Sequence, residues 1–305
     1  EFLLKKGYEV HGIVRRVALE NQEHRLWRIK KIQKKIHLHA GSMESYASIF
    51  KIFNKVKPNE FYHLAAQSYV DYSFQDEFST LSSNISSTHY CLSAIKESGL
   101  NTKFYFAGSS EMFGKVRKVP QNETTPFYPR SPYGISKVAG FELTRNYRES
   151  YNLHASSGIL FNHESERRGF EFVTRKISHA VALIKLKKLK YLELGNLQAK
   201  RDWGYAPEYV EAMWLMLQKK EPDDYVVGTG ETKTIKYVVE RAFGVLDLKY
   251  EKYLKINKKF FRPAEVELLI ADSSKIIKET GWKAKTKIDK LIEKMVINDL
   301  KLLNK

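Results

Sequence analysis

The sequence predicts an α/β fold in which helices cover both faces of a doubly wound parallel sheet. Two observations indicate this class. Short apolar stretches alternate with helical patterns throughout residues 1–163. The chain also has 305 residues, of which 43% are apolar and 13% aromatic, so it can bury the core that such a sheet requires.

The first residues of the chain already follow this alternation of helices and strands. Residues 1–7 have the pattern of the last two turns of a helix closed by Gly7, and residues 8–14 follow as an apolar-rich strand. That strand runs directly into Arg15 and Arg16. Residues 35–40 form the next predicted strand.

The following elements repeat the pattern. A helix over residues 45–56 keeps its apolar residues on one face and is stopped by Pro58. A longer helix around residues 78–98 ends at Gly99. The other predicted elements of this half are strands at 60–66 and 103–110, a helix at 131–151 with Pro132 in its first turn, and a strand at 154–162.

Beyond residue 163 the pattern loosens. Loops lengthen, and irregular segments join the later helices, at 206–219 and 287–300. We predict a Rossmann-like dinucleotide-binding domain over residues 1–163 and a smaller, mainly substrate-binding region over residues 164–305. Segments near 190–235 should return to the first domain, because residues 225–230 have the pattern of another strand of its sheet.

The composition excludes several classes of protein. No run of about 18 apolar residues occurs, so no transmembrane helix is predicted. The first residues also lack the apolar run of a signal peptide. Cys91 is the only cysteine, which excludes internal disulfides and fits a reducing compartment. We therefore predict a cytoplasmic protein without a membrane partner.

The formal net charge of +17 raises the alternative of nucleic-acid binding. Basic residues gather in three stretches, at 28–35, 185–190 and 252–262. None of them resembles a recognition helix, a zinc finger or an RNA-binding sheet motif. We interpret most of these residues as solvated side chains, expect no nucleic-acid partner, and expect some of the cations to meet phosphates of a small ligand. Nucleic-acid binding would instead be strongly salt-dependent.

The start of the predicted helix 131–151 carries the first indication of chemistry. Tyr133 and Lys137 are four residues apart, so their side chains lie on one helix face. A nearby ammonium group stabilises a phenolate, which should lower the pKa of the Tyr133 phenol toward that of a general base. The preceding strand ends in Ser109, Ser110 and Glu111, at the edge of a parallel sheet where ligands bind.

This arrangement is similar to that of the short-chain dehydrogenases/reductases, and longer motifs make the resemblance specific. The chain resembles the GDP-mannose 4,6-dehydratase family in four stretches: SSEMFGKVRKVPQNETTPFYPRSPYGISKVAG (109–140), GILFNHESERRGFEFVTRKI (158–177), LGNLQAKRDWG (194–204) and RPAEVELL (262–269). The resemblance extends from Glu1 to about Leu303 and is far more particular than a lone Tyr-x-x-x-Lys pair.

The resemblance implies a lyase that oxidises the hexose of GDP-mannose at C4, eliminates water across C5 and C6, and returns the hydride to C6. The product would be GDP-4-keto-6-deoxymannose. The implied catalytic residues are Ser109, Glu111, Tyr133 and Lys137. Tyr133 would act as the base on the C4 hydroxyl, and Glu111 would remove the acidified C5 proton and help the C6 hydroxyl leave. Ser109 would bind the C4 oxygen, in place of the threonine usual in the family.

NADP is the expected cofactor. Arg15 and Arg16 end a strand where an NAD enzyme carries an acid for the ribose 2′-hydroxyl, and two guanidinium groups there favour a 2′-phosphate. The alternative is that both are exposed loop arginines. The cofactor-binding residues implied by the resemblance are Arg15, Arg16, Ser42, Met43, Leu64, Ala65, Ala66, Ser68, Tyr133, Lys137, His163 and Arg168.

The nucleotide sugar needs charge-assisted donors for its pyrophosphate. The substrate-binding residues implied by the resemblance are Asn162, Val173, Lys176, Arg201, Arg262 and Glu265. Arg201 and Arg262 are assigned to phosphate, and Glu265 to guanosine. Each one alone could instead belong to an ordinary surface ion pair. No metal site is expected.

The chain departs from the family at two further places. Ser42 replaces an aspartate that contacts adenine, so we expect weaker adenine binding. Residues 17–27 replace a Ser-, Asn- and Thr-rich loop that joins family subunits into tetramers. We expect a homo-oligomer, either a dimer or a tetramer, in which this loop contact differs.

Other functions remain open. The chain could be a dehydratase or epimerase for a related GDP-hexose, or a nucleotide-sugar-binding remnant with impaired catalysis. Fucose, rhamnose and perosamine derivatives all branch from the same keto sugar, and GDP-fucose biosynthesis is the expected pathway. A Gly-rich turn for the dinucleotide pyrophosphate is missing from the sequence, so we expect a truncated chain that lacks roughly 20 residues of a βα unit. We also expect weak NADP binding and a sheet without one middle strand.

Overall fold

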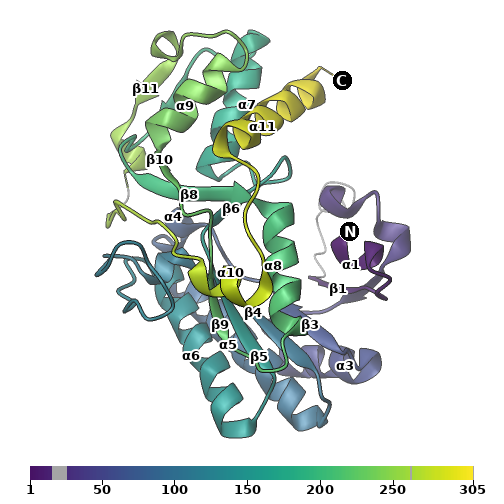
Figure 1. The fold of residues 1–305 in the computed structure, drawn as a ribbon. Coiled ribbons are helices and arrows are strands. Elements are labelled where there is room, and N and C mark those ends of the chain that lie inside the picture. The colour runs from purple at the N-terminus through teal and green to yellow at the C-terminus, as the bar shows by residue number, and fades with distance from the viewer. Residues whose placement is uncertain (16–25, 262, 305) are drawn as a thin grey trace.

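The computed structural model describes residues 1–15, 26–261 and 263–304 (Figure 1). At its centre is a four-stranded parallel sheet with the strand order β3-β4-β5-β9. These strands are Glu60–His63, Lys103–Ser109, Ala155–Leu160 and Asp224–Val227. The structure therefore confirms that the segments at 154–162 and 225–230 belong to one sheet, although about 60 residues separate them in the chain.

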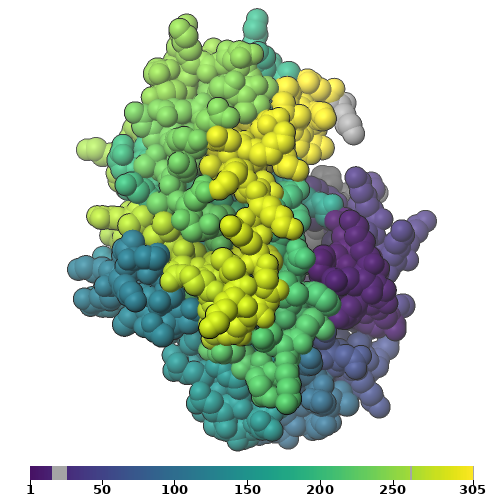
Figure 2. Space-filling model, in the orientation of Figure 1, coloured from purple at the N-terminus to yellow at the C-terminus, as the bar shows by residue number. Residues whose placement is uncertain are grey.

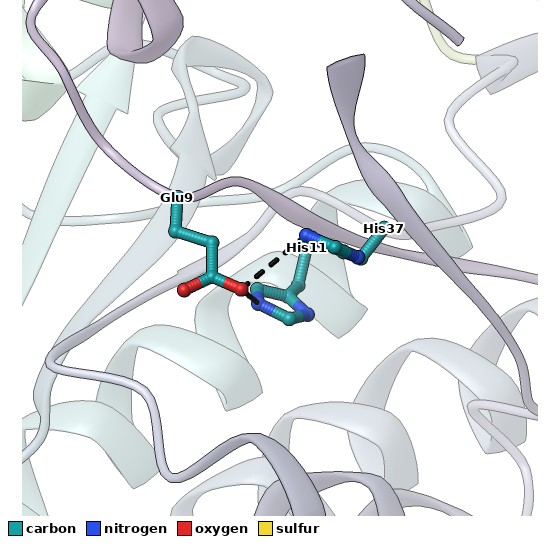
Figure 3. A group of neighbouring side chains, drawn as sticks. All are labelled: Glu9, His11 and His37. Atoms are coloured by element: carbon teal, nitrogen blue, oxygen red, sulfur yellow. Dashed lines mark hydrogen bonds and ion pairs between the residues drawn. The ribbon is translucent and has the colours of Figure 1, made fainter. Parts of the chain in front are cut away.

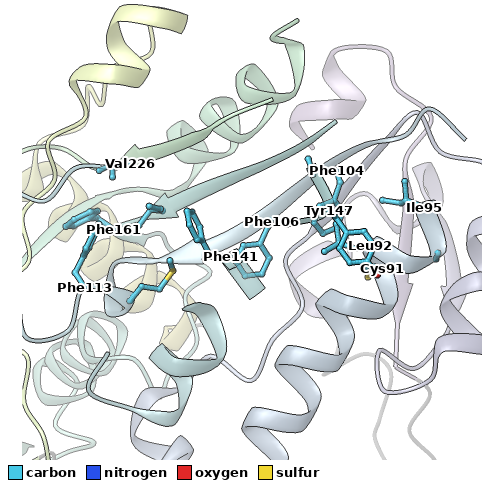
Figure 4. Packing of buried hydrophobic residues seen from close by; sticks show 14 of the residues in the cluster. Cys91, Leu92, Ile95, Phe104, Phe106, Phe113, Phe141, Tyr147, Phe161 and Val226 are labelled. Carbon is cyan, nitrogen blue, oxygen red and sulfur yellow. The ribbon is translucent and has the colours of Figure 1, made fainter. Parts of the chain in front are cut away.

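Alternating residues of β4 pack on opposite faces of this sheet. Phe104 and Phe106 contribute to a core shared with α3 (Tyr46–Val56), α5 (Glu77–Ser98) and α6 (Pro132–Tyr151), shown in Figure 4. Tyr105 lies between them in sequence and packs on the other face, in a core shared with α8 (Ala206–Gln218) and α10 (Ser274–Thr280). Helices thus cover both faces, as predicted for the doubly wound class.

Capping residues set the ends of these helices as the sequence predicts. Ser131 accepts a hydrogen bond from the backbone N–H of Gly134 at 3.0 Å, and Pro132 occupies the first turn of α6. Ser45 caps α3 in the same way. Gly99 ends α5 with a φ of +65°, a conformation that costs glycine little.

The N-terminal segment forms a separate unit. After α1 (Phe2–Lys5), β1 (His11–Val14) pairs in parallel with β2 (His37–Ala40). Within the described residues neither strand pairs with β3, so these parallel strands form two sheets and not one continuous sheet. Trp214 of α8 holds the unit in place, because its indole N–H donates to the Tyr8 hydroxyl at 2.8 Å and its ring meets that of Phe2.

Elements between residues 173 and 303 form a third hydrophobic core, at the end of the molecule away from the four-stranded sheet (Figure 1). This core joins three helices and a small parallel strand pair: α7 (Val173–Lys185), α9 (Ile235–Gly244), α11 (Ile288–Leu303), β7 (Leu192–Leu194) and β11 (Leu254–Ile256). Between it and the main sheet lies the sheet β10-β8-β6, formed by Thr232–Thr234, Lys200–Tyr205 and Asn162–Glu164.

The remaining described elements are short. They are α4 (Val70–Ser73) and the 3₁₀ turns Trp27–Ile29, Gln33–Lys35, Ser110–Met112, Tyr250–Lys252 and Lys258–Phe260. The space-filling view shows the segment that contains α10 and α11, in yellow, running across the face between the two ends of the molecule (Figure 2). None of the helices in the described part of the chain has the length and apolar character needed to span a bilayer.

Candidate active site

A cleft of about 480 Å³ opens where β4 and β5 end and α6 and α7 begin. It therefore lies at the carboxyl edge of the parallel sheet, the position expected for a ligand site in this class. Most of the residues singled out from the sequence line it: Leu64, Ala66, Ser68, Ser109, Glu111, Tyr133, Lys137, Asn162, His163, Arg168, Val173, Lys176, Arg201 and Glu265.

Four other predicted residues do not line this cleft. Arg15 pairs with Glu44 at 3.1 Å, and both side chains are largely exposed. Ser42 accepts a hydrogen bond from the Glu44 backbone, Met43 packs against the main core, and Ala65 lies next to the cleft residues Leu64 and Ala66. Arg16, Arg262 and most of the loop at 17–27 lie outside the described residues. The cofactor and substrate roles of these residues stay predictions.

Ser109 and Tyr133 meet at the floor of the cleft. Ser109 is the last residue of β4, and its hydroxyl accepts the Glu111 backbone N–H at 3.2 Å, which starts the 3₁₀ turn that carries Glu111. The Ser109 hydroxyl also hydrogen-bonds the Tyr133 phenol. This hydrogen bond joins the end of β4 to the start of α6, and a hydroxyl, a carboxylate and a phenol therefore line the same cleft.

Burial controls the proton affinity of the phenol. It raises the pKa of Tyr133 to about 12, with a smaller increase from the Glu111 carboxylate, while the Ser109 hydrogen bond and Arg168 act in the opposite direction. Lys137 lies with its Nζ 5.8 Å from the Tyr133 ring centre and donates to the Ala107 carbonyl at 2.8 Å. The prediction that Lys137 lowers the pKa of Tyr133 is therefore wrong for the protein alone.

Lys137 is itself perturbed. Only 5% of the residue is exposed, and burial lowers the pKa of its ammonium group to about 8. A ligand hydroxyl or a negative charge beside Lys137 would offset that desolvation. The buried ammonium group is therefore suited to hold a hydroxylated or anionic part of a ligand.

Glu164 is a site residue that sequence reasoning missed. Its carboxylate is buried, accepts the Thr174 hydroxyl at 2.5 Å and pairs with Nε of Arg168 at 3.2 Å. The guanidinium of Arg168 also lies 3.6 Å from the centre of the Phe172 ring. The NHESERRG motif contains the signal, an acid four residues before an arginine, but only the fold shows that the acid is buried.

The cleft wall farther from the sheet is basic. Nζ of Lys176 lies 3.6 Å above the Phe260 ring, and burial lowers the pKa of this ammonium group, with a further decrease from Lys259. Arg201 is almost fully buried and pairs with Glu265 at 3.2 Å. Trp203 is buried in the same wall. Cations at these positions suit the phosphates of a nucleotide.

Comparison with known proteins gives one family along nearly the whole chain. Residues 1–295 match the family model described as GDP-mannose 4,6 dehydratase. Among its relatives are the GDP-mannose 4,6 dehydratase of Drosophila melanogaster, 48% identical over 100% of this chain and 83% of the relative, and GDP-mannose 4,6 dehydratase 1 of Arabidopsis thaliana, 46% identical over 99% and 86%.

Solved structures agree on the fold. The structure of RMD from Pseudomonas aeruginosa complexed with NADPH superposes with a TM-score of 0.80 at 22% identity, covering 90% of this chain and 95% of that one. A UDP-glucose 4-epimerase from Thermotoga maritima, solved with UDP-glucose, gives a TM-score of 0.85 at 22% identity, covering 99% and 94%. At these identities the likeness establishes the fold alone.

Proposed function

Because the chain belongs to the GDP-mannose 4,6-dehydratase family, we propose that it is a hydro-lyase that converts GDP-mannose to GDP-4-keto-6-deoxymannose. One observation carries the proposal beyond family membership. The carboxylate of Glu111 and the phenol of Tyr133 line the same cleft, and a simple reductase of this fold would need only the phenol.

The cleft also fits a nicotinamide dinucleotide, and we propose NADP. Small residues, Ala66 and Ala107, line the side near the sheet and let a ligand approach the backbone. The buried ammonium group of Lys137 and the phenol of Tyr133 provide donors for a ribose at the cleft floor. Arg168 is available for a phosphate or the nicotinamide end. When bound, this cofactor supplies the hydride acceptor and donor.

Tyr133 and Ser109 would take part in the first proton transfer, in which the C4 hydroxyl of the hexose is deprotonated. The C4 hydroxyl of the hexose must lose a proton as its hydride leaves, and the Tyr133 phenolate oxygen can accept that proton. Because the Ser109 hydroxyl hydrogen-bonds Tyr133, it lies in position to bind the same C4 oxygen. Because burial raises the pKa of Tyr133 in the protein alone, a positive charge beside the phenol, such as the oxidised nicotinamide ring, would favour this step by lowering that pKa.

Glu111 would carry out the elimination. A ketone at C4 acidifies the C5 proton, and a carboxylate beside it can remove that proton. The same group, now protonated, can deliver a proton to the C6 hydroxyl, which leaves as water. Glu111 lies in the 3₁₀ turn directly after β4, so its backbone is fixed by the sheet and by the Ser109 cap.

The basic wall would hold the GDP part. Lys176, Arg201 and Glu265 line the cleft on the side of the third core, opposite the sheet. This supports the division into a cofactor-binding part at residues 1–163 and a mainly substrate-binding part at residues 164–305. We further propose a cytoplasmic homo-oligomer, for which a GDP-6-deoxyhexose pathway would be the consumer of the product.

Incubation with GDP-mannose and NADP⁺, followed by product analysis, tests the assignment. The native chain should form the 4-keto-6-deoxy product without net reduction of cofactor. Glu111→Gln should still oxidise C4 and accumulate reduced cofactor, because only the elimination is blocked. Tyr133→Phe should do neither. Binding of GDP-mannose without any keto product would mean a binding remnant, and turnover of another member of a GDP-hexose panel would reassign the substrate.

A further inference from the structure

Four side chains that play no part in the proposed reaction gather on one face of the β1–β2 pair. Glu9 lies two residues before His11, just ahead of β1, and His37 and His39 are two residues apart on β2. The strands are in register at His11 and His37, and the His37 N–H donates to the Val10 carbonyl at 2.9 Å. Side chains alternate along strands, so His11, His37 and His39 point to the same side, and Glu9 contacts His11 and His37 on that side (Figure 3 shows three of the four).

The spacing of three of these side chains matches a metal coordination sphere. Oε1 of Glu9 lies 3.1 Å from Nε2 of His11 and 3.3 Å from Nε2 of His37, and the three ligand atoms lie within 4.8 Å of one another. A tetrahedral ion with bonds of about 2.0–2.1 Å holds neighbouring ligand atoms roughly 3.3 Å apart. An ion can therefore enter between them with small side-chain shifts.

His39 supports the site by orienting His11 and is not itself a ligand of the ion. Its Nε2 lies 2.9 Å from Nδ1 of His11. When Nδ1–H of His11 donates this hydrogen bond, Nε2 of His11 is unprotonated and its lone pair points toward Glu9. A metal ion needs this tautomer in order to bind through Nε2. Without an ion, a proton on Nε2 makes the contact with Glu9, so the ion would replace that proton.

We propose that Glu9, His11 and His37 bind a divalent transition-metal ion of the zinc class, with His39 as the positioning residue for His11. Two imidazoles and one carboxylate leave a fourth position for water. The rings of His11 and His37 stack with an interplanar angle of 22°, so one ring must turn about χ2 to share an ion. The His37 side chain is 61% exposed and free to do so.

Such an ion would clamp the N-terminal strand pair. A sheet of two strands is marginally stable by itself, and a ligand that binds only the folded pair stabilises it by mass action. The far ends of the same two strands lead to Arg15 and to Ser42. The site therefore lies away from the cleft, and filling it should change the stability of this unit without changing the reacting groups.

The test uses the full chain without an affinity tag, dialysed against a chelator. Titration calorimetry with Zn²⁺ should give one saturable site per chain, Co²⁺ should give the intense visible bands of a tetrahedral complex, and Zn²⁺ should raise the melting temperature. Mg²⁺ and Ca²⁺ should have no effect, because these ions prefer all-oxygen ligands.

Variants identify the ligands. Glu9→Gln and His37→Asn should abolish saturable Zn²⁺ binding, and His39→Asn should weaken it by about 10- to 100-fold, as loss of a group that orients a ligand does. His89→Asn removes another exposed histidine, on α5, and is the matched control that should bind normally. Circular dichroism checks that each variant is folded. Zn²⁺ binding that Glu9→Gln and His37→Asn leave unchanged, or no saturable binding by the native chain, would overturn the proposal.

Discussion

Glu164 and Arg168 form an ion pair in the cleft wall, with Nε and Oε2 3.2 Å apart. The two partners differ in exposure, since the glutamate side chain is 1% exposed and the arginine side chain 25%. The buried carboxylate is fixed by the Thr174 hydroxyl, and the Phe172 ring lies under the guanidinium. Glu164 therefore holds the cation of Arg168 in place at the cleft, which both residues line.

Glu164→Gln should weaken NADP⁺ binding. The amide keeps the size of the side chain but loses the charge of the ion pair that orients Arg168, so we expect the affinity to fall by up to about tenfold, or about 1.4 kcal/mol. Fluorescence titration of the folded variant measures the dissociation constant. The matched control is Glu142→Gln, which breaks an exposed pair with Arg145 and should leave binding unchanged. Equal affinities for both variants would show that Glu164 does not position Arg168.

Tyr133→Phe should reduce kcat by about 10²- to 10⁴-fold, the range typical for loss of a general acid or base. Phenylalanine fills the same space and removes only the hydroxyl that bonds Ser109, so the fold should survive. The check is single-turnover reduction of the cofactor by GDP-mannose, alongside a melting curve. Ser109→Ala keeps the phenol and should have a smaller effect. A fully active Tyr133→Phe enzyme would assign the first proton to another group.

Lys137 should make stability depend on alkaline pH. Burial lowers the pKa of Lys137 to about 8 from the ordinary 10.5, so between these values the unfolded chain holds a proton that the folded chain has released. Stability therefore rises with pH across this window. Below it the cost of burying the ammonium group is fully present, and above it that cost is gone. The total change is on the order of 3 kcal/mol.

Urea unfolding at a series of pH values measures this slope. Lys137→Met should flatten the rise, whereas Lys51→Met, at an exposed position of α3, should leave it as in the native chain. Comparing the two variants cancels the titration of all other groups. Identical slopes for native chain and Lys137→Met would show that the ammonium group is solvated in the folded state.

The pair Arg175–Asp299 should be important for stability. Its atoms lie 2.6 Å apart, both side chains are at most 1% exposed, and it joins α7 to α11. Asp299→Asn leaves the Arg175 charge buried and unpaired, which should cost about 3–5 kcal/mol in urea unfolding. The double variant Arg175→Met, Asp299→Leu should recover part of the loss. Glu240→Gln, which breaks the exposed pair with Lys236, should cost at most about 1 kcal/mol.

Much of the fold was predictable because local signals decide helix ends and strand patterns. Ser131, Pro132 and Gly99 mark boundaries that the structure reproduces within a residue or two. The edge of the sheet that carries Ser109 and Glu111 was predictable for the same reason, since parallel strands end on one side. The burial of Glu164 and the pairing of Asp299 with Arg175 were not predictable, because both depend on how elements pack in the folded chain.

The sequence by itself determined the α/β class, the order of the elements, and the set of hydroxyl, carboxylate, phenol and ammonium groups in the cleft. These follow from near-neighbour geometry, in which periodicity, caps and spacing act within a few residues. Only the tertiary structure decided that β1 and β2 stand apart from the main sheet, that Arg15 pairs with Glu44 outside the cleft, and that the pKa of Tyr133 rises. Those outcomes depend on burial and on contacts between distant segments. The local sequence pattern does not determine how strongly each ionisable group is desolvated in the folded chain.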